Sequence, residues 1–289
     1  MKSLTAGVWV RGPRPAIFDL FGTSEGLKSW FAAEAEIILA AGMYNFWGDH
    51  TPEEPVQFSG HTRLIRVTAP ELLCFGWRLR GVESIVEIRL EERDGGTQVT
   101  VRHEGLQPRT ENAGAMHDFW CAALENLCLR VGTGRPQRML DYRRQTGSEF
   151  TLRIEIAGPP EQVFDKIANP EQIDRYFGRG AVVEPRVGGR ISFGWEEGGP
   201  QTITAFETGR RLAYRWKHGR ERETEVTWTL APAGDGTRLE LCHSGWYASF
   251  ESEAYRAGWF SFLVVVRAMI ELGDDWRPVA IEGARHGEV

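Results

Sequence analysis

The chain has 289 residues, of which 42% are hydrophobic and 26% charged, a composition typical of a globular protein with room for two domains. A formal net charge of -6, with no basic run, argues against a nucleic-acid-binding surface. No stretch approaches the ~18 consecutive apolar residues of a membrane span, and the N-terminus lacks an apolar signal-peptide core, so we expect a cytoplasmic protein that does not enter membranes.

The first half of the chain begins with alternating Val8 and Val10, which predict a β-strand ended by Gly12-Pro13. A short helical stretch is expected next, and then several strands of six to nine residues. Short turns between consecutive strands favour antiparallel pairing. The last element is predicted to be a helix, because its apolar residues are spaced i, i+4, i+7, i+11, namely Trp120, Leu124, Leu127 and Val131.

The second half repeats the same elements in the same order. "VWVRGPRPAIF" at residues 8–18 matches "IEIAGPPEQVF" at residues 154–164, and "GTQVTVRHEGL" at 96–106 matches "GTRLELCHSGW" at 236–246. Thr237 and His243 each lie 140 residues after their counterparts, Thr97 and His103. Two copies of one domain explain this offset.

Each copy is predicted to be an α+β helix-grip domain, in which a curved antiparallel sheet wraps a long C-terminal helix and two short helices follow the first strand. The segment between the copies is rich in Gly, Arg and Gln and weakly periodic, as a linker would be. We therefore predict a first domain at 1–132, a linker at 133–149, a second domain at 150–273 and a C-terminal tail at 274–289.

The long helix of the second copy carries two further apolar residues, Phe260 and Val264, on the face opposite its apolar stripe. Exposed apolar residues there would indicate a domain-domain contact or a homodimer contact. The alternative is that the tail covers them, with Trp276 folding back.

The order of these motifs resembles the START-like ligand-binding superfamily called SRPBCC. The resemblance rests on the Pro-containing helix pair, "RRLAYRW" at 210–216, "GTRLELCHSGW" and the terminal helix with Trp259. More narrowly, it is similar to the C-terminal domain of the activator of the heat-shock-protein-90 ATPase, closely over residues 150–272 and more loosely over 6–132. The resemblance implies a helix-grip fold, and it specifies function poorly.

Aromatic residues on the inner strand faces predict an apolar hollow between sheet and helix, unless those side chains fill it. The first copy holds Ala123 where the second holds Phe262, so we predict the roomier cavity in the first copy. The predicted lining residues are Tyr44, Phe46, Phe75, Trp77, His103, His117 and Trp120 in the first copy, and Phe193, Trp195, Tyr214, Trp216, Trp228, His243 and Trp259 in the second.

The two repeated histidines, His103 and His243, face inward by the period-two rule of strands. Each is either a polar group at the cavity mouth, able to orient a ligand or move a proton, or a structural hydrogen-bonding residue. Their occurrence in both copies favours the structural interpretation. His117 lies one helical turn before Trp120 and lines the cavity opening or faces solvent.

The sequence carries no nucleophile elbow, P-loop, dinucleotide-binding glycine pattern or HExxH motif, and its histidines lack metal-ligand spacing. We therefore predict no catalytic residue, metal or cofactor, and the leading hypothesis is binding of a small apolar or aromatic molecule. Two alternatives follow from the resemblance. One is an enzyme like a polyketide cyclase or aromatase, with His103 or His117 as candidates, and the other is activation of a chaperone ATPase.

Overall fold

The computed structural model describes residues 2–52, 62–79, 81–106, 112–143, 147–177, 179–194, 199–219, 221–247 and 249–283. The chain forms two compact units, which we describe separately. The first unit comprises Met1–Arg144 together with Asp274–Val289, and the second comprises Gln145–Gly273.

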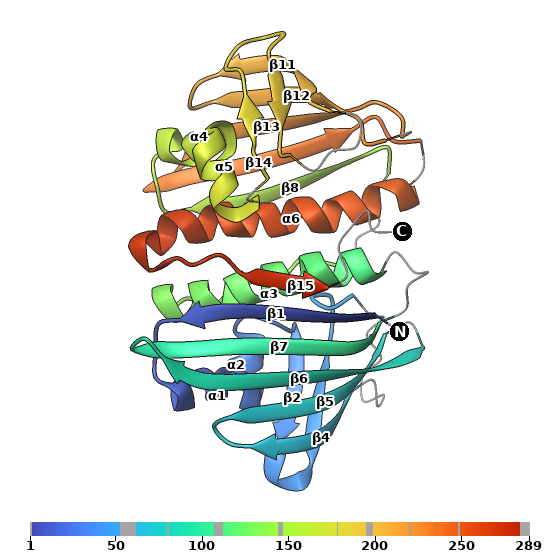
Figure 1. Cartoon of the computed structure of the whole chain (residues 1–289), viewed down its shortest axis with the longest axis vertical. Helices are drawn as coiled ribbons and strands as arrows, with labels where there is room; N and C mark the ends of the chain where they lie inside the picture. Colours follow the sequence, from blue (N-terminus) through green and yellow to red (C-terminus); the bar gives the residue numbers. More distant parts are fainter. Residues whose placement is uncertain are drawn as a thin grey trace. The chain divides into compact units, whose positions relative to one another are not determined.

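The first unit is built on an antiparallel sheet with the strand order β15-β1-β7-β6-β5-β4 (Figure 1). Two short helices and a separate hairpin stand between β1 and β4, and the long helix α3 follows β7, whereas β15 (Ala280–Gly283) joins the sheet from the C-terminal end of the chain. In chain order its elements are β1 (Lys2–Val10), α1 (Arg14–Gly22), α2 (Ser24–Lys28), β2 (Glu34–Ile38), η1 (Leu39–Ala41), β3 (Met43–Trp47), β4 (Thr62–Thr68), β5 (Leu72–Leu79), β6 (Val82–Arg93), β7 (Gly96–Leu106) and α3 (Asn112–Thr133).

The second unit repeats this plan in an antiparallel sheet with the order β8-β14-β13-β12-β11-β10-β9. Its elements are β8 (Glu149–Ile156), α4 (Pro160–Ala168), α5 (Pro170–Phe177), β9 (Val182–Val183), β10 (Arg190–Ser192), β11 (Gln201–Glu207), β12 (Arg211–Trp216), β13 (Thr224–Ala233), β14 (Gly236–Ser244) and α6 (Ser249–Glu271). The chain then continues through η2 (Gly273–Asp275) to β15 (Ala280–Gly283). The prediction of two tandem helix-grip domains is confirmed.

In both units a Gly-Thr pair at the start of one strand, β7 or β14, is hydrogen-bonded to the turn after the first strand, β1 or β8. The Thr97 hydroxyl donates to the Gly12 carbonyl at 2.8 Å, and the Thr237 hydroxyl donates to the Gly158 carbonyl at 2.7 Å. The glycine before each threonine permits this approach, because a Cβ on Gly236 would lie 2.2 Å from the Ile156 carbonyl oxygen. The Gly-Thr pair is therefore a structural clasp in both units.

The predicted linker at 133–149 is divided between structural roles. Helix α3 extends to Thr133, and the chain after it packs on the first unit. The Gln137 N–H donates to the Ser29 carbonyl at 2.7 Å, and Met139 and Leu140 are buried. Strand β8 already begins at Glu149. Burial of these apolar side chains holds the segment against the first unit.

The predicted tail at 274–289 contributes to the first unit. Strand β15 pairs antiparallel with β1, with Leu4 opposite Gly283 and Gly7 opposite Ala280. Because β1 would otherwise leave a row of backbone groups unpaired, the added strand satisfies them. The Trp276 side chain, just before this strand, is buried.

The apolar pair on α6, Phe260 and Val264, differs in exposure. Val264 is buried and Phe260 is half-buried, so only Phe260 leaves part of its side chain accessible, and a contact with a second molecule through this pair stays a prediction. All four cysteines are free thiols. Within the described part of the chain, none of the helices combines the length and the hydropathy that crossing a bilayer requires.

Candidate functional site

In the first unit, His103 is fully buried and joins three elements through its ring nitrogens. The Trp120 indole N–H on α3 donates to His103 Nδ1 at 3.1 Å, and His103 Nε2 lies 2.8 Å from Ser84 Oγ. The Ser84 hydroxyl donates to the Trp77 carbonyl at 2.6 Å. Since the serine proton is used there, Nε2 carries the imidazole proton and donates it to Ser84.

The second unit has the same chain of contacts. The Trp259 indole N–H donates to His243 Nδ1 at 2.9 Å, and His243 Nε2 lies 2.8 Å from Thr224 Oγ1. The Thr224 hydroxyl donates to the Trp216 carbonyl at 3.2 Å. Ser84 and Thr224 each stand 19 residues before their histidine, a spacing that sequence reasoning missed although both copies show it.

Burial holds both histidines in the neutral form. It lowers the pKa of His103 and that of His243 to about 3. Both nitrogens of each ring are already engaged, one as donor and one as acceptor. Neither histidine is placed to exchange a proton with a ligand at neutral pH, so the geometry favours the structural interpretation of the repeated histidine.

The structure brings the predicted aromatic residues of the first unit together. The Trp77 ring stacks on His103 with centroids 5.7 Å apart, and Phe75 contacts Tyr44 at 4.9 Å. Two rings that sequence reasoning did not select, Phe31 and Phe119, complete the cluster. The predicted members of this buried cluster are Tyr44, Phe46, Phe75, Trp77, His103 and Trp120.

The aromatic cluster of the second unit is centred on Phe262. Its ring lies 5.2 Å from Trp228 and 5.9 Å from Phe193. The Trp228 indole N–H donates to the Tyr214 hydroxyl at 3.1 Å. The predicted residues in this cluster are Phe193, Tyr214, Trp216, Trp228, His243 and Trp259, all buried, whereas Trp195 lies outside the described residues.

The two units differ at two matching inner positions. Val101 and Leu241 each stand two residues before the histidine of their unit, and they pair with Ile88 and Trp228. The first unit therefore has isoleucine where the second has tryptophan.

The second difference lies on the long helices. Ala123 and Phe262 each follow, by three residues, the tryptophan that bonds the histidine, and both are buried. At one position the first unit has the larger side chain: Phe119 stands where the second unit has Gly258, near the start of the apolar stripe of the helix. At the middle of the helix the first unit thus has less side-chain volume than the second.

Tyr44 supplies a polar group to this cluster. It is 2% exposed, and among the residues that the structure describes, none forms a hydrogen bond with its hydroxyl. Burial raises the pKa of Tyr44 well above its ordinary value, so the hydroxyl keeps its proton. A buried tyrosine hydroxyl can both donate to and accept from a bound molecule.

His117 is in a different environment from His103. Its side chain is 31% exposed, and Nδ1 lies 3.2 Å from the Asp118 carboxylate. Over the described ranges, no three His, Cys, Asp or Glu side chains are grouped so that they could hold a metal ion.

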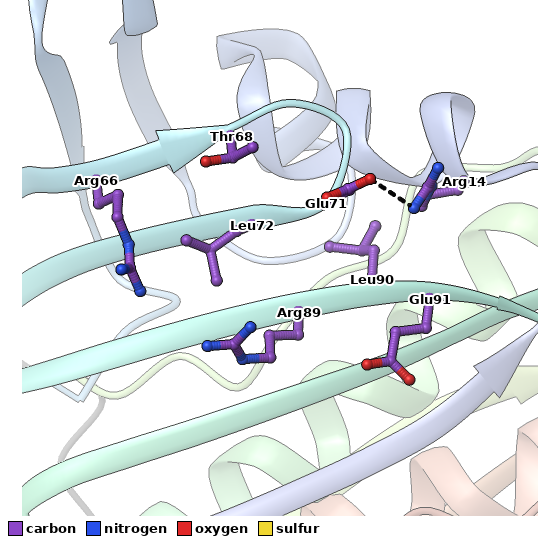
Figure 2. Close-up of a pocket in the computed structure, with 8 residues that line it drawn as sticks. All are labelled: Arg14, Arg66, Thr68, Glu71, Leu72, Arg89, Leu90 and Glu91. Atoms are coloured by element: carbon purple, nitrogen blue, oxygen red, sulfur yellow. Dashed lines mark hydrogen bonds and ion pairs between the residues drawn. The ribbon is translucent and has the colours of Figure 1, made fainter.

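A polar hollow of about 390 Å³ lies where the β4–β5 turn meets the start of α1 (Figure 2). Arg66 and Arg89 both pair with Glu87, at 2.9 and 2.8 Å. Arg14 pairs with Glu71 at 3.2 Å. Arg66 and Arg89 thus share one glutamate and Arg14 pairs with another, and this charged hollow differs in chemistry from the predicted apolar cavity.

Both units resemble one family of known proteins. A family model described as "Activator of Hsp90 ATPase homolog 1-like protein" matches residues 11–131 and, a second time, residues 157–270, one match in each unit. No curated protein matches the chain.

Similar solved structures include protein MLL2253 from Mesorhizobium loti, 25% identical, with 44% of this chain and 98% of that chain covered and a TM-score of 0.37. The Aha1 dimer from Colwellia psychrerythraea is 20% identical, with 44% and 98% covered and a TM-score of 0.38. DynU16, a protein of the dynemicin biosynthetic locus, is 17% identical, with 93% and 97% covered and a TM-score of 0.38.

Proposed function

The chain belongs to the family of activator of Hsp90 ATPase homolog 1-like proteins, and from that premise we propose that it binds a small apolar or aromatic molecule between the sheet and helix α3 of its first unit. The observation that carries the proposal is the pair Ile88 and Ala123. These residues stand where Trp228 and Phe262 occupy the inside of the second unit. Space bordered by apolar side chains and a few polar groups is the usual setting of a ligand site.

The surroundings of this space define the chemistry of the ligand. Aromatic rings, among them Tyr44 and Phe75, favour a flat apolar molecule. The Tyr44 hydroxyl would bond one polar atom of that molecule, whereas His103 is already fully bonded. The four free thiols support a reducing compartment, in agreement with a cytoplasmic protein.

The test is titration with an environment-sensitive apolar fluorophore, using variants that exchange side-chain volume between the units. Ala123→Phe places in the first unit the ring that the second unit already has, and we expect it to weaken binding at least about tenfold by filling the space. Phe262→Ala is the matched control in the second unit and leaves the first-unit site intact. Tyr44→Phe should weaken binding of a polar-ended probe about fivefold, since one hydrogen bond is worth about 1 kcal/mol.

Equal probe affinity in Ala123→Phe and the unaltered protein would refute the proposed location. Circular dichroism and urea unfolding of each variant establish that the fold is retained, so that weaker binding is not a consequence of unfolding. Of the two candidates for a cyclase-like or aromatase-like reaction, His103 has no free nitrogen, so that alternative depends on His117.

A second candidate function is stimulation of an Hsp90-type chaperone ATPase, and the family match is the observation that favours it. The measurement is the steady-state ATPase rate of such a chaperone with increasing amounts of this protein. A saturable rise in rate would support this function, and an unchanged rate at micromolar excess would argue against it.

A further inference from the structure

The segment 274–283, which we name the C-terminal strap, is attached to the first unit at three points. Strand β15 pairs with β1, and Asp275 forms an ion pair with Arg11. Between these two points, the indole N–H of Trp276 donates to both carboxyl oxygens of Glu125 on α3, at 3.1 and 3.3 Å. Trp276 is 3% exposed and Glu125 is 1% exposed.

Glu125 is a buried acid whose hydrogen-bond donors come from the strap. Besides Trp276, the backbone N–H of Val279 donates to it. Cys121 lies one turn before it on α3 and Cys128 lies one turn after it. Burial is the main reason that the pKa of each of these thiols is raised, so both are neutral.

The other charged groups on α3, β1 and the strap have partners of their own or are exposed. On α3, the Asp118 carboxylate lies beside His117, and on β1 Arg11 is paired with Asp275. On the strap, Arg277 donates to the carbonyls of Asp274 and Trp276. Glu282, on β15, is exposed. Among the described residues no cation forms an ion pair with Glu125, so its charge would be uncompensated.

We propose that the C-terminal strap is a releasable element of the first unit, which closes over α3 when Glu125 is protonated and opens when Glu125 ionises. When the strap is closed, Trp276 and Val279 cover the carboxyl group. When the strap opens, water replaces both donors and solvates the ionised carboxylate. In the closed strap the same charge would be buried, which is unfavourable. The proposal concerns the strap and α3 only, and does not depend on ligand binding.

The direction of the pH dependence follows from the linkage between proton binding and strap closure. Burial, the largest cause, raises the pKa of Glu125 to about 8, and the donors Trp276 and Val279 lower it only in part. With the strap open, the carboxyl group returns toward its ordinary pKa of 4.5. The closed form therefore binds the proton more tightly, and the closing equilibrium falls about tenfold per pH unit between these two values.

The test is hydrogen exchange by mass spectrometry between pH 5.5 and 9, with rates corrected for the intrinsic pH dependence of exchange. The probe is the backbone of β15, and β14 in the second unit is the internal reference. We expect protection of β15 to decrease about tenfold per pH unit up to about pH 8. Protection of β6 and β7 should exceed that of β15 at every pH, because the strap opens without unfolding of the unit, and β14 should not follow the trend of β15.

Three variants make the test specific. Glu125→Gln keeps the shape of the side chain and cannot ionise, so its β15 protection should be independent of pH. Glu282→Gln removes an exposed charge from the strap itself and should keep the pH dependence of the unaltered chain. Trp276→Phe retains a ring but loses the indole N–H, so β15 should be less protected at every pH.

Three results would overturn the proposal. One is β15 protection in the unaltered chain that does not change with pH, a result that needs no variant. Another is protection of β6 and β7 no greater than that of β15 across the pH range, because the first unit would then unfold as a whole. The third is β15 protection in Glu125→Gln that falls with pH as steeply as in the unaltered chain, because the pH dependence would then belong to another group.

Discussion

At the scale of single residues, the histidine of each unit is a structural connector. His103 receives a hydrogen bond from α3 and gives one to Ser84, whose hydroxyl continues to the carbonyl of Trp77 on β5. A neutral imidazole is suited to this position because it has one donor and one acceptor on opposite sides of the ring. Conversion of this side chain to one with no polar atoms leaves buried groups without partners.

We predict that His103→Ala destabilises the first unit by about 3 kcal/mol. The loss combines two hydrogen bonds, the unpaired Trp120 indole N–H and a cavity. Urea unfolding at pH 7 measures it, and His243→Ala should cost the second unit a similar amount, since its contacts have the same lengths within 0.2 Å. A cost below about 1 kcal/mol would contradict the structural role.

The same two residues predict acid lability. Burial lowers the pKa of His103 and of His243 to about 3, from 6.5 when unfolded. Below pH 6.5 the unfolded chain binds protons that the folded chain does not, so stability falls as pH falls toward 3. At pH 5 the loss is about 2 kcal/mol per histidine. Urea unfolding at pH 7 and pH 5 measures it, and a variant with Gln at both positions should show a smaller difference.

At the scale of elements, the clasp between the last and first strands depends on a glycine without a side chain. In the second unit, a Cβ on Gly236 would lie 2.2 Å from the Ile156 carbonyl oxygen. Backbone atoms on β8 would have to move, and with them the Thr237 bond to Gly158. The close approach explains why both copies have Gly-Thr at the start of this strand.

We predict that Gly236→Ala destabilises the second unit by about 2 kcal/mol, because the new methyl group displaces β8. Gly147→Ala is the control in the same unit, since no heavy atom lies within 4 Å of its added Cβ. The control should change stability by less than about 0.5 kcal/mol. Thermal unfolding of both variants, side by side, measures the difference, and equal stability would mean that the clasp is not required.

Most of the fold could be predicted from the sequence, because the evidence for it is local or repeated. Period-two strands, the stripe containing Trp120 and Leu124, and the matching phrases establish the order of elements in both units. The β1–β15 pairing could not, since β15 has four residues and its partner lies at the other end of the chain. The burial of Leu140 in the predicted linker is likewise a packing result without a periodic signal.

The candidate site was predictable only in composition. Inner faces rich in aromatic residues were readable from alternation, and the Ala123 and Phe262 difference from alignment of the copies. The sequence does not indicate which hydroxyl bonds which histidine, although Ser84 and Thr224 occupy equivalent positions. Whether space remains beside Ala123 depends on how rings from distant strands pack, and spacing in the sequence does not fix that. The lining role of Trp195 stays a prediction.

At the scale of the whole molecule, the two units are not equal copies. The first unit contains both ends of the chain, because β15 extends the sheet beside β1 and Trp276 contacts α3. The second unit is one continuous segment, Gln145–Gly273. The units should therefore respond differently to shortening of the C-terminus.

We predict that a chain ending at Gly273 loses about 3 kcal/mol or more of stability in its first unit and little in its second. Burial of the Trp276 ring and the pairing of β15 are both lost. Hydrogen exchange resolved by segment measures the two units separately within one chain. Equal protection of β7 in the full and shortened chains would show that the strap adds no stability.

The most direct test of the proposed ligand site is native mass spectrometry of the protein purified without detergent, compared with Ala123→Phe prepared identically. We predict one small apolar molecule bound per chain, absent from the variant and recoverable by solvent extraction for identification. An unaltered chain that carries no added mass, and that takes up no apolar molecule when these are supplied, would contradict it.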